Sequence, residues 1–127
     1  EIESVLREAL YAKIHMATVT ECNPMYSGSI TIDEDLLTAT GLRVNEKVLV
    51  ADADSTNRFE TYIFKGESGS GMIGVNGAAA KLTGIGHKVI IMSFCQLDDA
   101  EFGNHSPKVI ICDEHNRVQE TIEYLPG

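Results

Sequence analysis

The stretch Tyr26-Ser27-Gly28-Ser29-Ile30-Thr31-Ile32-Asp33 joins a turn of small residues to a β-branched run that ends at an acidic residue. Ile30-Thr31-Ile32 favours a strand. Asp33 is typical of a helix N-cap, and Gly41 is typical of the end of that helix. The stretch therefore predicts a turn, a strand and a short helix in succession.

Gly28-Ser29 also has the chemistry of a peptide bond that cleaves itself. Gly28 has no Cβ, so its backbone can tilt the carbonyl toward the Ser29 hydroxyl. Attack by that hydroxyl would move the acyl group from nitrogen to oxygen, and elimination followed by hydrolysis would leave a pyruvoyl group at residue 29. Taken alone, the dipeptide is also typical of an ordinary turn, and both interpretations stand at this point.

Length and charge limit the classes of protein. A chain of 127 residues with 43% hydrophobic content predicts a single domain over residues 1–127. Ten basic against 19 acidic residues give a net charge of -9, which disfavours nucleic acid and anionic membranes as partners. With no apolar run near the roughly 20 residues that cross a bilayer and no signal-peptide pattern, we expect a cytoplasmic protein.

The hydrophobic pattern predicts a mostly β fold with short helices. Alternation over residues 11–21 favours a strand with Lys13 and His15 on one face. Residues 1–10 are compatible with a helix or a strand. Turn signals every eight to twelve residues or so favour a small barrel. The other predicted elements are strands at 48–50, 59–64, 89–94 and 109–112, a glycine-rich loop at 66–74 and a helical turn at 98–100.

Two motifs match known sites only in part. Gly69 to Gly74 fits G-x-G-x-x-G, but no adequate helix follows, so a flexible loop is the better interpretation. Asp52-Ala53-Asp54 resembles the start of a calcium loop, yet Asn57 and Ile63 stand where glycine and glutamate are required. Because the four histidines also lack metal-site spacing, we expect no metal.

Two further stretches carry polar groups suited to a small anionic ligand. Asn76 precedes Gly77-Ala78-Ala79-Ala80, where exposed backbone N–H groups could hold a carboxylate, although a tightly packed helix start explains the same residues. In Arg58-Phe59-Glu60-Thr61-Tyr62, a strand would put Arg58 and Tyr62 on one face and Thr61 on the other. One pocket could use all three only near a bend or a subunit boundary, and a solvated arginine with a core tyrosine is the alternative.

Four motifs in order resemble the family of pyruvoyl-dependent aspartate decarboxylases: Lys13-Ile14-His15, the stretch at 26–33, the stretch at 58–62, and Asn76 to Ala80. The resemblance is collinear over nearly the whole chain. It implies a double-psi β-barrel and a homotetramer with active sites between neighbouring subunits. It also implies a proenzyme that cleaves itself between Gly28 and Ser29, giving a β chain of residues 1–28 and an α chain of residues 29–127.

The activity implied by the resemblance is decarboxylation of L-aspartate to β-alanine and CO2 for pantothenate and coenzyme A synthesis. Ser29 would become the covalent pyruvoyl group, which forms a Schiff base with the substrate, with no need for metal or pyridoxal phosphate. Tyr62 would be the proton donor. Thr61 would contribute to cleavage and to substrate contact.

The remaining roles implied by the resemblance concern binding. The Lys13 and Arg58 side chains would lie near the substrate carboxylates. Asn76 would lie near the cofactor, with His15 and Tyr26 in support. The substrate-binding backbone would be that of Gly77, Ala78 and Ala79.

Some positions depart from the family's usual pattern. Pro24 and Met25 precede the cleavage site, Ala51 stands where some members have a large aromatic residue, and Met16 replaces a common arginine. These departures bear on the rate and completeness of cleavage, for which an accessory maturation factor is a possible partner. The alternatives are a non-catalytic barrel that binds without cleaving itself and a pyruvoyl decarboxylase acting on another amino acid.

Overall fold

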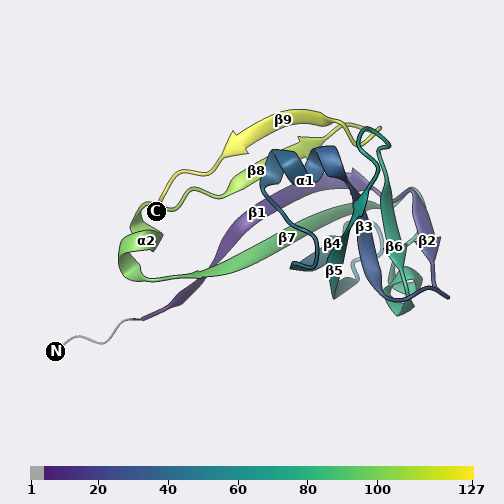
Figure 1. The fold of residues 1–127 in the computed structure, drawn as a ribbon, viewed down its shortest axis with the longest axis horizontal. Helices are drawn as coiled ribbons and strands as arrows, with labels where there is room; N and C mark the ends of the chain where they lie inside the picture. The colour runs from purple at the N-terminus through teal and green to yellow at the C-terminus, as the bar shows by residue number, and fades with distance from the viewer. Residues whose placement is uncertain (1–4) are drawn as a thin grey trace.

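The computed structural model describes residues 5–127, in which nine strands form one sheet of mixed pairing (Figure 1). The strand order is β2-β6-β3-β5-β4-β7-β1-β8-β9. The elements are β1 (Arg7–Thr18), β2 (Glu21–Asn23), β3 (Ser29–Asp33), α1 (Glu34–Thr40), β4 (Lys47–Asp52), β5 (Arg58–Gly66), β6 (Ile73–Asn76), the 3-10 helix η1 (Ala78–Leu82), β7 (Lys88–Leu97), α2 (Asp99–Gly103), β8 (Lys108–Cys112) and β9 (Val118–Glu123).

The mostly β, barrel-like fold with short helices is confirmed. The pairs β1–β8, β2–β6 and β3–β5 are parallel, and the other pairs are antiparallel, an arrangement consistent with the expected double-psi barrel. Isoleucines from different strands, including Ile14, Ile30, Ile63 and Ile91, are fully buried in one core. Long strands β1 and β7 run together from this core toward α2 (Figure 1).

A bulge in β1 shifts its alternation. Ala12 and Ile14 are buried, and then Ala17 and Val19 are buried, because the pairing with β7 shifts between Ile14 and Ala17. Met16 adopts a φ of 60° at this point. Lys13 and His15 pair with β8 in regular register before the bulge, so they lie on one face of the strand, as the sequence predicts.

Both predicted helical segments exist and begin at aspartate caps. The Asp33 carboxylate accepts a hydrogen bond from the Asp35 N–H, and α1 ends at Gly41 in the left-handed region. Asp98 caps α2 in a reciprocal pair of hydrogen bonds with Glu101. The cap residues Asp33 and Gly41 therefore predicted the ends of α1, whereas α2 extends beyond the helical turn expected at 98–100.

The structure also corrects the sequence analysis. Strands β2 and β9 were not predicted, and the last residues of the predicted glycine loop, Ile73 and Gly74, lie in β6. The ambiguous N-terminal segment is extended from Arg7, and its first four residues lie outside the described part. In that described part, no helix has the length and apolar character of a membrane span.

Candidate active site

Ser29 is the first residue of β3, and its side chain is fully buried. The antiparallel pairing of β3 with β6 places it opposite Asn76. Asn76 Nδ2 donates to Ser29 Oγ over 2.9 Å and to Thr31 Oγ1 over 3.2 Å. One amide group thus holds the hydroxyl next to the Gly28-Ser29 bond.

The orientation of the Asn76 amide is itself fixed. Asn23 Nδ2 donates to Asn76 Oδ1 over 3.1 Å, which leaves Asn76 Nδ2 directed at Ser29. Because Asn23 is in β2 and Asn76 is in β6, the parallel β2–β6 pair supports the contact with β3. A buried, oriented donor of this kind polarises the hydroxyl that it contacts.

Gly77 packs directly against Gly28. A Cβ on Gly77 would lie 2.6 Å from Gly28 Cα and 2.8 Å from Gly28 N. Gly77 also has φ 81° and ψ -158°, a conformation that glycine alone adopts readily. The conformational freedom that the sequence analysis assigned to Gly28 is therefore used at Gly77, since Gly28 does not have a positive φ.

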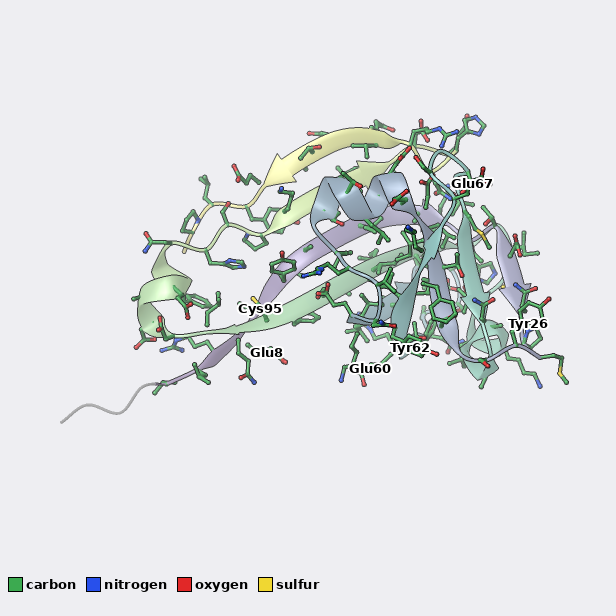
Figure 2. All side chains as sticks on the ribbon, viewed as in Figure 1. Glu8, Tyr26, Glu60, Tyr62, Glu67 and Cys95 are labelled. Atoms are coloured by element: carbon green, nitrogen blue, oxygen red, sulfur yellow. The ribbon has the colours of Figure 1, made fainter. Side chains whose placement is uncertain are left out.

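An open cleft of about 450 Å³ lies beside Ser29. Phe64 and Met72 give it apolar walls, and Phe64 meets the ring of Tyr62 edge-on at 5.6 Å between centroids. Tyr62 and Tyr26 lie in the part of the molecule that holds β2, β3 and β6 (Figure 2). The lining residues are Glu21, Asn23, Tyr26, Ser27, Ser29, Thr31, Phe64, Met72 and Asn76.

The faces of β5 are as the sequence predicts. Arg58, Glu60 and Tyr62 are on the more exposed face, whereas Phe59 and Ile63 are buried and Thr61 is half-buried on the other face. The parallel pairing of Ile30 with Ile63 brings the start of β3 to the part of β5 that carries Tyr62 and Phe64. Arg58 lies four residues earlier, at the beginning of β5.

The predicted site residues Lys13 and His15 lie on β1, which does not pair with the strand of Ser29. Between β3 and β1 the sheet order places β5, β4 and β7. Lys13 Nζ lies over the ring of Tyr124, 5.5 Å from its centroid. His15 Nδ1 is buried without a hydrogen-bond partner, and burial, together with the nearby Lys13 charge, lowers the pKa of His15. A single chain therefore does not pair the strand of Lys13 with the strand of Ser29.

The substrate-binding backbone proposed at Gly77 to Ala79 begins η1. Gly77 is the N-cap and has no side-chain hydrogen bond, while Ala80 N donates to Gly77 O over 3.0 Å. Ala78 is exposed and Ala79 is half-buried. The alternative interpretation, a helix start, agrees with the structure, since the same residues form a 3-10 turn beside Gly28, whereas the substrate-binding role stays a prediction.

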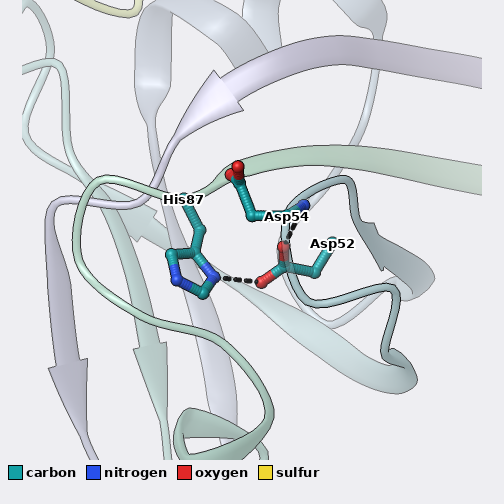
Figure 3. Close-up of side chains that lie close together, drawn as sticks. All are labelled: Asp52, Asp54 and His87. Atoms are coloured by element: carbon teal, nitrogen blue, oxygen red, sulfur yellow. Dashed lines mark hydrogen bonds and ion pairs between the residues drawn. The ribbon is translucent and has the colours of Figure 1, made fainter.

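The sequence analysis missed a polar cluster at Asp52, Asp54 and His87 (Figure 3). One side-chain oxygen from each aspartate and one ring nitrogen of His87 lie within 4.8 Å of one another. His87 Nδ1 is 2.7 Å from Asp52 Oδ2. No spacing rule could have found this cluster, because 35 residues separate Asp52 from His87.

Comparisons with known proteins identify the family of the chain. A family model for aspartate decarboxylase matches residues 5–119. The chain is 53% identical over 114 residues to an aspartate 1-decarboxylase of Caldicellulosiruptor saccharolyticus, covering 90% of this chain and 89% of that protein.

Two other relatives cover still more of the chain. An aspartate 1-decarboxylase of Neisseria meningitidis is 48% identical to it over 122 residues, which cover 96% of each chain. One of Bacillus velezensis is also 48% identical, over 121 residues that cover 95% of each chain. The chain belongs to the aspartate decarboxylase family.

Proposed function

We propose that this chain is an enzyme that converts L-aspartate to β-alanine and CO2. The observation that carries the proposal is the hydrogen bond from the Asn76 amide to the buried Ser29 hydroxyl, at the wall of an open cleft. The relatives named aspartate 1-decarboxylase support aspartate as the substrate. The proposal includes the pantothenate and coenzyme A pathway, which rests on the family resemblance, and a cytoplasmic location, which rests on the sequence pattern.

The proposed cofactor is a pyruvoyl group made from Ser29. Its Oγ attacks the Gly28 carbonyl carbon, and the C–N bond of Gly28-Ser29 breaks to give an ester and a free amine. Loss of the Ser29 Cα proton then breaks the Cβ–Oγ bond and releases the Gly28 carboxylate. Hydrolysis of the remaining dehydroalanine releases ammonia and leaves the ketone. The buried hydroxyl held by Asn76, and the Gly28–Gly77 packing that excludes a Cβ, fit this group.

The pyruvoyl carbonyl supplies an acceptor for the substrate amine and for the electrons released as CO2 leaves. The residues of the chain perform the other tasks. Arg58 suits a carboxylate because its planar guanidinium donates two parallel hydrogen bonds, and Lys13 adds a second cation in a chain of charge -9. The Tyr62 hydroxyl donates the proton to the former α-carbon.

The proposal requires a homotetramer whose sites lie between neighbouring subunits. Lys13 and Ser29 are on strands that do not pair within one chain, so a second copy would supply the missing cation. Tyr26 and Phe64, which line the cleft, and Tyr62, which contacts Phe64, are exposed, with 68%, 42% and 38% of their surface accessible. Apolar surface of this kind is typical of a contact between subunits. A maturation factor that speeds cleavage remains part of the proposal.

The direct test is a substrate comparison with the purified protein. We expect β-alanine from L-aspartate and little or no γ-aminobutyrate from L-glutamate, since the extra methylene displaces one carboxylate. Equal turnover of glutamate would favour the alternative of a decarboxylase for another amino acid. Absence of turnover in a chain that stays uncleaved would favour the non-catalytic binding module.

A further inference from the structure

We propose that Asp52 is a positioning residue that sets the distance between Arg58 and the Gly77–Ala79 backbone. The inference rests on the proposed function, with Arg58 near a substrate carboxylate and the Gly77–Ala79 backbone in contact with the substrate. Asp52 ends β4, the turn after it leads to Arg58, and its carboxylate also binds the segment that follows η1. One buried side chain thus links both halves of the binding site.

The Asp52 carboxylate accepts four hydrogen bonds from two separate segments. Oδ1 accepts from the backbone N–H groups of Asp54 and Ser55, at 2.7 and 2.9 Å. Oδ2 accepts from Thr83 Oγ1 at 2.6 Å and from His87 Nδ1 at 2.7 Å. Because a carboxylate only accepts, His87 carries its proton on Nδ1. The first oxygen shapes the β4–β5 turn, and the second fixes the residues after η1.

The same turn also binds the last residue of η1. Ser55 Oγ and Asn57 Nδ2 each donate to the Leu82 carbonyl over 3.0 Å. Asn57 directly precedes Arg58, and Leu82 directly precedes Thr83. The backbone leading into Arg58 is therefore joined to the end of η1 by these two hydrogen bonds, in addition to those of Asp52.

The turn between β4 and β5 has a backbone conformation that is unfavourable for its residues. Thr56 has φ 68°, in the left-handed region, which a β-branched residue rarely adopts. Thr56 N donates a hydrogen bond to Asp52 O over 3.0 Å, and Asp52 N donates to Asn57 O over 2.9 Å. The hydrogen bonds of Asp52 offset the cost of this strained conformation. We therefore expect their loss to relax the turn and to move Arg58.

The charge of Asp52 is maintained by its donors. Burial alone would raise the pKa of Asp52, but the hydrogen bonds from Thr83, Ser55, His87 and Asp54 lower it well below its usual value. Each oxygen already accepts two hydrogen bonds from the chain, so Asp52 acts as an internal connector and we do not assign it to a metal. Gly84 completes the arrangement, since a Cβ there would lie 2.9 Å from His87 Nε2.

Thr83→Val removes one hydrogen bond to Asp52 while keeping the side-chain shape, and Thr83→Ser keeps the hydroxyl. The probe is succinate, a dicarboxylate without the amine that reacts, with its affinity measured by calorimetry on the purified oligomer. We expect roughly tenfold weaker succinate binding in Thr83→Val, because small displacements of positioning groups have large effects on binding and rate. The KM for aspartate should rise by a similar factor, kcat should change less, and Thr83→Ser should restore both.

The control is Thr40→Val, since the Thr40 hydroxyl is buried and its hydrogen bonds are to backbone groups of Leu36, Leu37 and Leu42, in α1 and just after it. This control should lower thermal stability without changing the affinity for succinate. If Thr83→Val does not fold, Asn57→Ala tests the joining of the same turn to η1, because it removes the hydrogen bond to the Leu82 carbonyl from an exposed position. The expected loss is smaller, about threefold, on the scale of one hydrogen bond.

The outcomes separate this inference from the proposed function. Wild-type affinity for succinate in a folded Thr83→Val, or in Asn57→Ala if the first variant does not fold, would overturn the positioning role, even with wild-type β-alanine formation intact. A wild-type protein that binds no succinate would overturn it as well. If the wild type binds succinate but makes no β-alanine, the proposed reaction fails, while weaker binding in Thr83→Val would still support the role of Asp52.

Discussion

The Asn76 side chain donates a hydrogen bond to the Ser29 hydroxyl over 2.9 Å, although 47 positions separate the two residues in the sequence. The contact exists because β3 and β6 pair antiparallel with Ser29 opposite Asn76. Asn23 holds the other end of the same amide. The hydroxyl beside the Gly28-Ser29 bond is therefore positioned by the sheet itself.

Asn76→Ala removes this donor and leaves a buried hydroxyl without its partner. We expect a loss of about 1–3 kcal/mol in the free energy of unfolding, together with slower cleavage at Gly28-Ser29. Urea unfolding measures the first effect and mass spectrometry measures the second. Asn104→Ala is the control, since the exposed Asn104 side chain donates only to the Ala100 carbonyl. Unchanged stability and cleavage in Asn76→Ala would contradict the role of the amide.

Gly77→Ala places a methyl group against Gly28. The new Cβ would lie 2.6 Å from Gly28 Cα, and the positive φ of 81° is itself unfavourable for alanine. We expect a destabilisation of about 3 kcal/mol and little cleavage. Gly103→Ala is the control, because nothing lies within 4 Å of its Cβ position. Equal stability of the two variants by thermal denaturation would refute the close packing of Gly77 on Gly28.

Tyr62→Phe tests the proton donor separately from cleavage. The variant keeps the ring that contacts Phe64 and loses only the hydroxyl, so we expect normal cleavage with kcat reduced roughly 100-fold or more. β-Alanine formation by the cleaved protein measures the effect. Tyr11→Phe is a matched control, because Tyr11 and Tyr62 are both 38% exposed. Turnover as fast as that of the wild type would remove Tyr62 from this role.

Asp52→Asn tests the charge of the buried carboxylate through pH. The folded protein holds the Asp52 pKa below its ordinary value of 3.8, so the ionised form stabilises the fold above that value. This stabilisation is lost as the pH falls, because the unfolded chain takes up the proton first. We expect the wild type to exceed Asp52→Asn in unfolding free energy at pH 6 and the difference to shrink toward pH 2. A difference independent of pH in urea titrations would contradict the ionised state.

The sequence predicted the elements whose signals are local. The period-two alternation around Lys13, the Asp33 cap and the Gly41 stop each reflect interactions within a few residues. β2 has only three residues and β6 adjoins a glycine-rich loop, so neither shows a hydrophobic period of its own. The mostly exposed β9 pairs only with β8 and needs little apolar surface.

The missing parts of the candidate site depend on contacts between distant segments. The sequence gives no sign that Gly77 packs on Gly28, or that Asp52 meets His87, because sheet pairing brings these residues together. Burial of Ser29 likewise follows from its place between β5 and β6. The alternation along β5 did predict that Tyr62 and Thr61 lie on opposite faces, since side-chain direction in a strand is local.

In the proposed function, Ser29 becomes the cofactor by cleavage of its own peptide bond. The most direct measurement is the intact mass of the purified protein under denaturing conditions, after prolonged warming, beside Ser29→Ala. We expect two fragments in the wild type, residues 1–28 and residues 29–127 with the pyruvoyl group in place of serine, and a single chain in Ser29→Ala. A wild type that stays one chain, or a Ser29→Ala variant that still makes β-alanine, would contradict it.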